Sequence, residues 1–192
     1  MGLSTQLNAI IEKDEHGYFA SVPELNGCFS QGDSFEEALN NRLMEYCSMT
    51  KSEKAISCFN SGFNCSQAVI SSFADDFGLD EKQSLKIASA FGGGVCRKGD
   101  TCGAISGGLM AIGLKHGMSE NTDTFSKDKT YELSNIFIEE FKKIYGTIMC
   151  RELLGYDLSK LEEVNAHKEK NSGTNLCPQY VGDAAKILDK IL

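Results

Sequence analysis

The chain has 192 residues, 27 acidic and 19 basic side chains and a formal net charge of −8. It has no basic cluster to neutralise phosphates, which argues against a nucleic-acid partner. No apolar run approaches the roughly 20 residues that span a bilayer, so we expect no membrane partner. The first residues lack a basic segment followed by an apolar core, so we expect no signal peptide and a cytoplasmic location.

Acidity is distributed unevenly along the chain. Residues 1–50 hold eight acidic and two basic side chains, whereas residues 51–192 hold nineteen and seventeen. This difference indicates two units, and we place a small domain at 1–48 and a larger one at 49–192. An acidic first unit would suit a basic protein partner, although a solvated acidic face explains the charge as well.

The first unit has the pattern β-β-(β)-α. Apolar residues alternate over 7–12, a turn follows at 14–17, and a second strand covers 18–22 before Pro23. Residues 28–31 form a short third strand in this interpretation. Ser34 and Glu37 then have the spacing of a capping box, which predicts the start of a helix.

From Thr50 onward the pattern is helical, so the predicted fold class is α+β. Polar caps followed by apolar periodicity predict helices beginning near residues 50, 64 and 80, one over 103–116, a long one over 130–150, and a last one opened by Pro178. Residues 156–175 are polar and contain glycine, so we expect a loop there that covers the functional site.

Four of the eight cysteines are the main candidates for chemistry. Cys65, Cys102 and Cys177 stand at predicted helix starts, and Cys150 ends the predicted long helix. Unpaired N–H groups and a partial positive charge at a helix start favour a thiolate, which can act as a nucleophile, a redox centre or a metal ligand. We therefore interpret the four as one constellation, assembled within one chain or across a homodimer.

The segment from 91 to 117 is the richest in glycine and cysteine. Gly103 and the other small residues would let another backbone or a bulky inorganic group approach closely, and Arg97 would make the region electropositive. Gly103 and Arg97 are therefore the candidate cofactor-binding residues. Neither glycine-rich nucleotide-binding pattern is present, so phosphate binding is the weaker interpretation.

Cysteine spacing excludes several common sites. There is no C-x-x-C, so neither a zinc ribbon nor a thioredoxin-like motif fits. Four thiolates from separate helices could still hold an iron–sulfur cluster or zinc, or form two disulfide-bonding pairs without a cofactor. Cys28, Cys47 and Cys58 are interpreted as small apolar core residues, and the role of Cys96 stays open.

The cysteine segments resemble a family of redox-active proteins named for its C-GCAxxG-C-C pattern. The resemblance covers about residues 52–192 and rests on GFNCSQA at 62–68, FGGG at 91–94, CGAISG at 102–107, CRELLG at 150–155 and CP at 177–178. It implies a redox role for Cys65, Cys102, Cys150 and Cys177. A similar domain is associated with split-Soret cytochromes, but the haem attachment motif of those proteins is absent here.

The first unit resembles a truncated HicB-type antitoxin domain. The matching segments are AIIEKD at 9–14, GYF at 17–19, PELNGC at 23–28 and GDSFEEA at 32–38, and the resemblance ends near Leu43. It implies a protein partner for this unit, which could serve for docking or dimerisation.

Three functions are therefore in competition. The leading hypothesis is a redox protein, an oxidoreductase or an electron-transfer protein with an unidentified redox partner, in which the four cysteines hold an iron–sulfur or other metal centre or cycle between dithiol and disulfide. The alternatives are a non-catalytic zinc-binding or metal-delivery protein and an antitoxin-like interaction protein.

Overall fold

A computed structural model describes residues 10–14, 16–21, 29–40, 49–170 and 176–192. The chain divides into two compact units, Met1–Thr50 and Lys51–Leu192, which are described separately below. The expected boundary after residue 48 lies beside this division. Cys28 and Cys47 are outside the described residues.

The first unit is a three-stranded antiparallel sheet with one helix. Strands β1 (Ile10–Asp14), β2 (Gly17–Ser21) and β3 (Phe29–Gly32) pair in the order β1-β2-β3, and α1 (Phe35–Asn40) packs on them. The hairpin requires Gly17, because its φ is +128° and a Cβ there would lie 2.7 Å from the Gly32 carbonyl oxygen. Ser34 caps α1 by accepting the Glu37 N–H at 3.1 Å.

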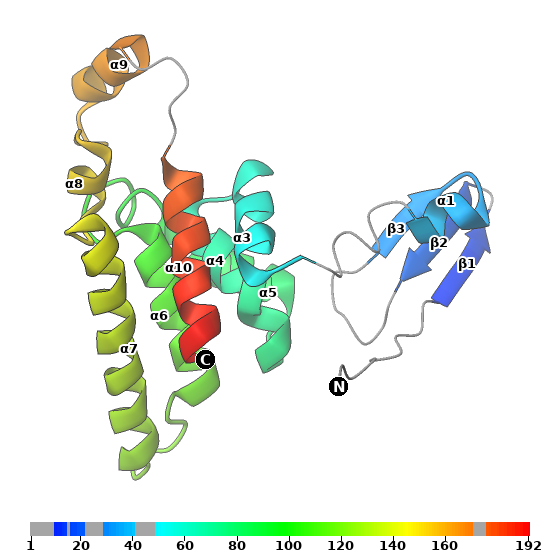
Figure 1. Cartoon of the computed structure of the whole chain (residues 1–192), viewed down its shortest axis with the longest axis horizontal. Coiled ribbons are helices and arrows are strands. Elements are labelled where there is room, and N and C mark those ends of the chain that lie inside the picture. Colours follow the sequence, from blue (N-terminus) through cyan, green and yellow to red (C-terminus); the bar gives the residue numbers. More distant parts are fainter. Residues whose placement is uncertain (1–9, 15, 22–28, 41–48, 171–175) are drawn as a thin grey trace. The chain divides into compact units, whose positions relative to one another are not determined.

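The second unit is helical, which confirms the α+β fold class (Figure 1). Its elements are α3 (Lys51–Asn60), α4 (Cys65–Ala74), η1 (Asp75–Phe77), α5 (Glu81–Ala88), η2 (Ser89–Phe91), α6 (Gly103–His116), α7 (Thr124–Tyr145), α8 (Cys150–Leu154), α9 (Leu161–Lys170) and α10 (Cys177–Ile191). The predicted capping box of Asn64 and Gln67 is confirmed at the start of α4. Among the described helices, none is both long and apolar enough to span a bilayer.

The core of this unit is built around α6 and α10. Helix α10 packs against α3, α4, α6 and α7 (Figure 1). Helix α6 approaches its neighbours closely because it presents glycine: a Cβ on Gly107 would lie 2.5 Å from the Ser66 carbonyl oxygen, and one on Gly108 would lie 2.4 Å from the Phe137 ring. Phe137 and Phe141 of α7 are fully buried in this core.

Two predictions about the second half were wrong. The long helix ends at Tyr145 rather than Cys150, because Gly146 adopts a left-handed conformation (φ +77°) and its N–H closes the helix on the Lys142 carbonyl. The polar segment 156–175, predicted as a loop, contains α9. Glu163 in the first turn of α9 accepts the Asp157 N–H at 2.8 Å, which ties the preceding chain to the helix start.

Candidate functional site

The four candidate cysteines meet at one pocket within a single chain. Cys65, Cys150 and Cys177 are the first residues of α4, α8 and α10, and Cys102 is the N-cap residue of α6. All four line a cavity of about 250 Å³. Cys150 thus begins a helix instead of ending one, so all four sulfur atoms belong to helix starts.

A short antiparallel bridge places Cys102 beside Cys150. Thr101 pairs with Met149, the Cys102 N–H donates to the Ile148 carbonyl at 2.8 Å, and the Cys150 N–H donates to the Asp100 carbonyl at 2.7 Å. These bonds tie the segment before α6 to the segment before α8. The two helix starts therefore face the pocket from adjoining backbone.

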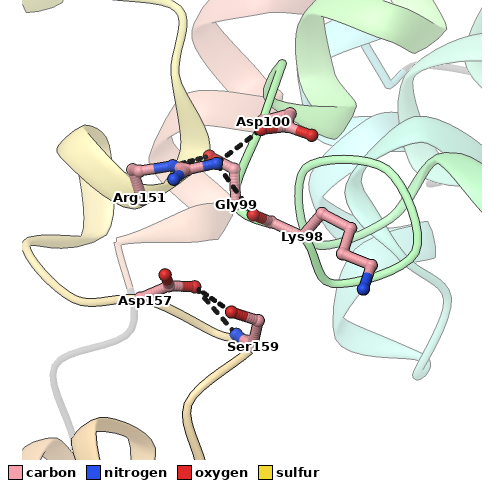
Figure 2. Close-up of polar contacts among 6 residues, drawn as sticks. All are labelled: Lys98, Gly99, Asp100, Arg151, Asp157 and Ser159. Atoms are coloured by element: carbon pink, nitrogen blue, oxygen red, sulfur yellow. Dashed lines mark hydrogen bonds and ion pairs between the residues drawn. The ribbon is translucent and has the colours of Figure 1, made fainter.

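Arg151 strengthens the same connection (Figure 2). Its Nε donates to the Gly99 carbonyl at 3.1 Å, and Nη2 donates to the Lys98 carbonyl at 3.0 Å and pairs with the Asp100 carboxylate. A guanidinium group offers several donors in one plane, which suits it to binding successive carbonyl groups. Sequence reasoning missed this role, because nothing in the local pattern connects residue 151 with residues 98–100.

Gly103 brings the start of α6 against the start of α4. A Cβ at residue 103 would lie 2.9 Å from the Cys65 Cβ and 3.0 Å from the Ser66 nitrogen. The structure therefore gives Gly103 a packing role that sets Cys102 next to Cys65. Its predicted contact with a cofactor stays a prediction.

A left-handed turn forms another side of the site. Residues 93–97 all have positive φ, including the three non-glycine residues Val95, Cys96 and Arg97 at 51° to 61°. Such a conformation is costly for side chains with a Cβ, and here the Cys96 and Arg97 N–H groups donate back to Ala90 and Gly92. Gly94 is needed inside the turn, since a Cβ there would lie 2.6 Å from the Cys150 Cβ.

The turn carries Arg97 and Cys96 on its outer side. Both are exposed, and neither is among the described residues that line the pocket. The structure therefore does not bring Arg97 to the four cysteines. The Cys96 thiol donates to the Ala90 carbonyl at 3.3 Å, so it serves the turn itself. Cys58 lies half-buried against the core, as predicted for a small apolar residue.

The remaining pocket wall is apolar. It consists of the side chains of Phe59, Phe63, Leu153, Leu154, Leu158 and Tyr180, together with Asn64 and backbone at Gly62 and Gly93. Tyr180 uses its hydroxyl group to donate to the Leu153 carbonyl at 2.8 Å. None of the described lining residues is Lys, Arg, His, Asp or Glu. In the sequence, Leu153, Leu154 and Leu158 follow Cys150 closely, and this spacing is the signal that could have identified them.

Burial determines the protonation of two of the cysteines. Desolvation raises the pKa of Cys102 to about 11, and the backbone N–H groups of Ala104 and Ile105 offset only part of this rise. Desolvation also raises the pKa of Cys150 to about 12, with the neighbouring Cys102 and Cys177 adding to it. The expectation that a helix start favours a thiolate at Cys102 therefore does not agree with its raised pKa, because loss of hydration outweighs the backbone N–H groups.

Cys65 and Cys177 behave as a pair. Their side chains are hydrogen-bonded, which raises the pKa of Cys65 well above the ordinary value and lowers the pKa of Cys177. Cys65 is buried, whereas Cys177 is only partly buried. The group that most readily becomes a thiolate is also the more accessible one.

No disulfide is found among the described cysteines. Nor do the described residues include three or more His, Cys, Asp or Glu side chains positioned to hold a metal. Four sulfur donors on one cavity nonetheless fit a thiophilic metal in chemical character. The donor set therefore suits such a metal, while the side-chain positions do not by themselves define its site.

Four thiols gathered at helix starts around one pocket are the common feature of this site. The chain belongs to the family described as "Putative redox-active protein (C_GCAxxG_C_C)", whose sequence pattern matches residues 63–191. It is also 71% identical over 35 residues to a UPF0150 protein of Helicobacter pylori strain J99. That match covers 18% of this chain and about half (49%) of the relative's length. No solved structure matches the chain.

Proposed function

We propose that this protein is a thiol-based redox protein in which Cys65 and Cys177 cycle between a dithiol and a disulfide. The observation that carries the proposal is that both thiols line the same pocket, with Cys177 the less buried of the two. The neighbouring Cys65 side chain also lowers the pKa of Cys177. The two residues begin α4 and α10, so two separate helices bring the pair together at the pocket. Thiol–disulfide exchange requires one accessible thiolate and one nearby resolving thiol.

The reaction proceeds in two exchanges with an external disulfide, RSSR. The Cys177 thiolate attacks one sulfur, the S–S bond of RSSR breaks, and RS⁻ leaves with a mixed disulfide on Cys177. Cys65 then loses its proton, attacks the Cys177 sulfur and releases the second RS⁻. The two released thiolates take up the two protons, so RSSR is reduced to two RSH while the two cysteines are oxidised to one disulfide.

A metal or cluster centre bound by all four cysteines is the second candidate. It is favoured by the gathering of four sulfur donors at one pocket, where the neighbouring cysteines raise the pKa of Cys65 and Cys150 and a cation would offset the charge of their thiolates. Cys65, Cys102, Cys150 and Cys177 would hold the group. A cluster would supply one-electron transfer, and zinc would supply structural stability.

An anaerobic visible spectrum and a metal analysis of the purified protein distinguish the candidates. A dithiol protein gives no visible band and less than one metal atom per chain, and it releases titratable thiols on reduction. A brown band that bleaches with dithionite would contradict the dithiol proposal and favour a cluster. One colourless zinc per chain, with no change in thiol content on oxidation, would favour the metal-binding alternative.

We propose that the first unit binds another protein, the role that a HicB-type domain would have. Deleting residues 1–48 should remove a partner recovered with the full chain and leave the thiol chemistry of the second unit intact. Retention of the partner by the shortened chain would contradict this role.

A further inference from the structure

The pocket that holds the cysteine pair also has the properties of a substrate site. Its volume of about 250 Å³ lies near the lower end of the range for small-molecule pockets. An apolar cavity of about 150 Å³ is enough for benzene. The volume therefore suits a small molecule.

The walls favour an uncharged ligand. Phe59, Phe63, Leu154 and Leu158 supply apolar surface, and Phe63 keeps 39% of its surface exposed, which is unfavourable in water unless something covers it. A carboxylate or ammonium group entering between these residues would lose hydration without gaining an oppositely charged partner among the described lining residues.

Arg151 does not compensate for this lost hydration. Arg151 has its guanidinium engaged by the Asp100 carboxylate and by the carbonyl groups of Lys98 and Gly99 (Figure 2). An anionic substrate would have to displace these bonds to gain an ion pair. The guanidinium of Arg151 is thus committed to holding the backbone of the site.

The exposure of the sulfur atoms sets the direction of entry. Cys102 and Cys150 keep 3% and 5% of their surface exposed and Cys65 keeps 8%, whereas Cys177 is only partly buried. A molecule entering the pocket therefore reaches Cys177 first and has the Cys65 thiol close behind it. This order matches the attacking and resolving roles in the exchange.

We propose that the pocket selects small, uncharged, mainly apolar disulfides as the substrates that oxidise the Cys65–Cys177 pair. The inference rests on the proposed dithiol function and adds the chemical class of the oxidant. The oxidant RSSR is reduced to two RSH molecules, as balanced above, and its two alkyl groups lie against the apolar walls.

The test compares diethyl disulfide with 3,3′-dithiodipropionate, which differs by a carboxylate on each arm. Full-length reduced protein is mixed anaerobically with each reagent, quenched with acid and mapped for the Cys65–Cys177 disulfide. Each rate is divided by the rate of the same reagent with 2-mercaptoethanol, to remove differences in intrinsic reactivity. We expect the normalised rate for diethyl disulfide to be greater by about tenfold or more, which corresponds to about 1.4 kcal/mol.

Two phenylalanine variants provide a matched comparison. Phe63→Ala removes part of the pocket mouth and should reduce the preference several-fold, while Phe125→Ala, at a position that is 80% exposed on α7, should leave it unchanged. Equal normalised rates for both reagents in the unmodified protein, with the disulfide formed, would overturn the proposed selectivity but preserve the dithiol function. Failure of both reagents to form the Cys65–Cys177 disulfide would overturn the dithiol function itself.

Discussion

The guanidinium of Arg151 pairs with the carboxylate of Asp100 across 51 residues of sequence and also holds the carbonyl groups of Lys98 and Gly99 (Figure 2). This pair lies beside the backbone bridge that sets Cys102 against Cys150. The geometry of half the cysteine site therefore depends on a residue that is not itself in the pocket.

Arg151→Ala should loosen the segment 98–100 without creating a cavity in the hydrophobic core. We expect a loss of about 1–3 kcal/mol in the free energy of unfolding, because two backbone carbonyl groups lose a charged donor, and faster alkylation of Cys150. The measurement is urea unfolding together with thiol-labelling rates. Lys143→Ala, which breaks an exposed pair on α7, is the control and should change neither quantity. Unchanged labelling of Cys150 in Arg151→Ala would contradict the positioning role.

Two glycines of α6 should respond to alanine in opposite directions. Gly107→Ala places a Cβ 2.5 Å from the Ser66 carbonyl oxygen, so we expect a loss of about 1–3 kcal/mol in stability as α4 is pushed away. A Cβ at Gly113 meets no atom within 4 Å, so Gly113→Ala should stabilise the helix by about 0.5–1 kcal/mol. Thermal or urea unfolding checks both changes, and equal effects of the two would refute the close packing of α6 on α4.

Cys177→Ser should abolish oxidation of the pair by a disulfide, because the attacking sulfur is lost, while the circular dichroism spectrum stays unchanged. Cys96→Ser is the matched control, since Cys96 is exposed but lies outside the described pocket lining. Acid-quenched mass mapping after mixing with diethyl disulfide gives the result. Continued formation of a disulfide on Cys65 in Cys177→Ser would show that another cysteine attacks.

Alkaline pH should destabilise the folded protein through the buried thiols. The pKa of Cys102 is raised to about 11 and that of Cys150 to about 12, against an ordinary value of 9.0. As the pH rises, the unfolded chain therefore loses these protons before the folded protein does. Their contribution to the free energy of unfolding is fully present below pH 9 and is lost as the pH rises toward 12. Measured by urea unfolding across this pH range, the free energy of unfolding should fall less for Cys102→Ala than for the unmodified protein. An identical fall would argue that Cys102 is not buried as a thiol.

The same chemistry predicts an order of thiol labelling. The lowered pKa of Cys177 makes it a thiolate at lower pH than Cys65, Cys102 or Cys150. Among these four, iodoacetamide near neutral pH should label Cys177 first. Mass mapping after brief treatment measures the order, and first labelling of Cys102 or Cys150 would contradict the assignment.

The local structure was predicted well where a helix cap or a helix end is formed by residues that are adjacent in the sequence. Asn64 and Gln67 start α4 as expected, and the predicted span 103–116 coincides with α6. The end of α7 was misplaced, because the apolar pattern continues past Gly146 while the left-handed backbone there stops the helix. Helix α9 was missed because its polar residues lack a strong apolar period.

The candidate site was predictable in its members but not in its chemistry. The positions of Cys65, Cys102 and Cys177 at helix starts follow from local signals. The burial that raises the pKa of Cys102 depends on the packing of α6 against helices that are distant in the sequence. No pattern in the residues around Cys102 predicts it. The same holds for the contacts of Arg151, which join segments far apart in the chain.

The most direct test of the account is to identify the first disulfide that forms in the full-length reduced protein. One equivalent of diethyl disulfide is added anaerobically, the reaction is quenched in acid, and the linked peptides are mapped. The account predicts a Cys65–Cys177 link, formed before any other, in a colourless protein. A first link between Cys102 and Cys150, or a visible chromophore that bleaches on reduction while all four thiols resist oxidation, would contradict it.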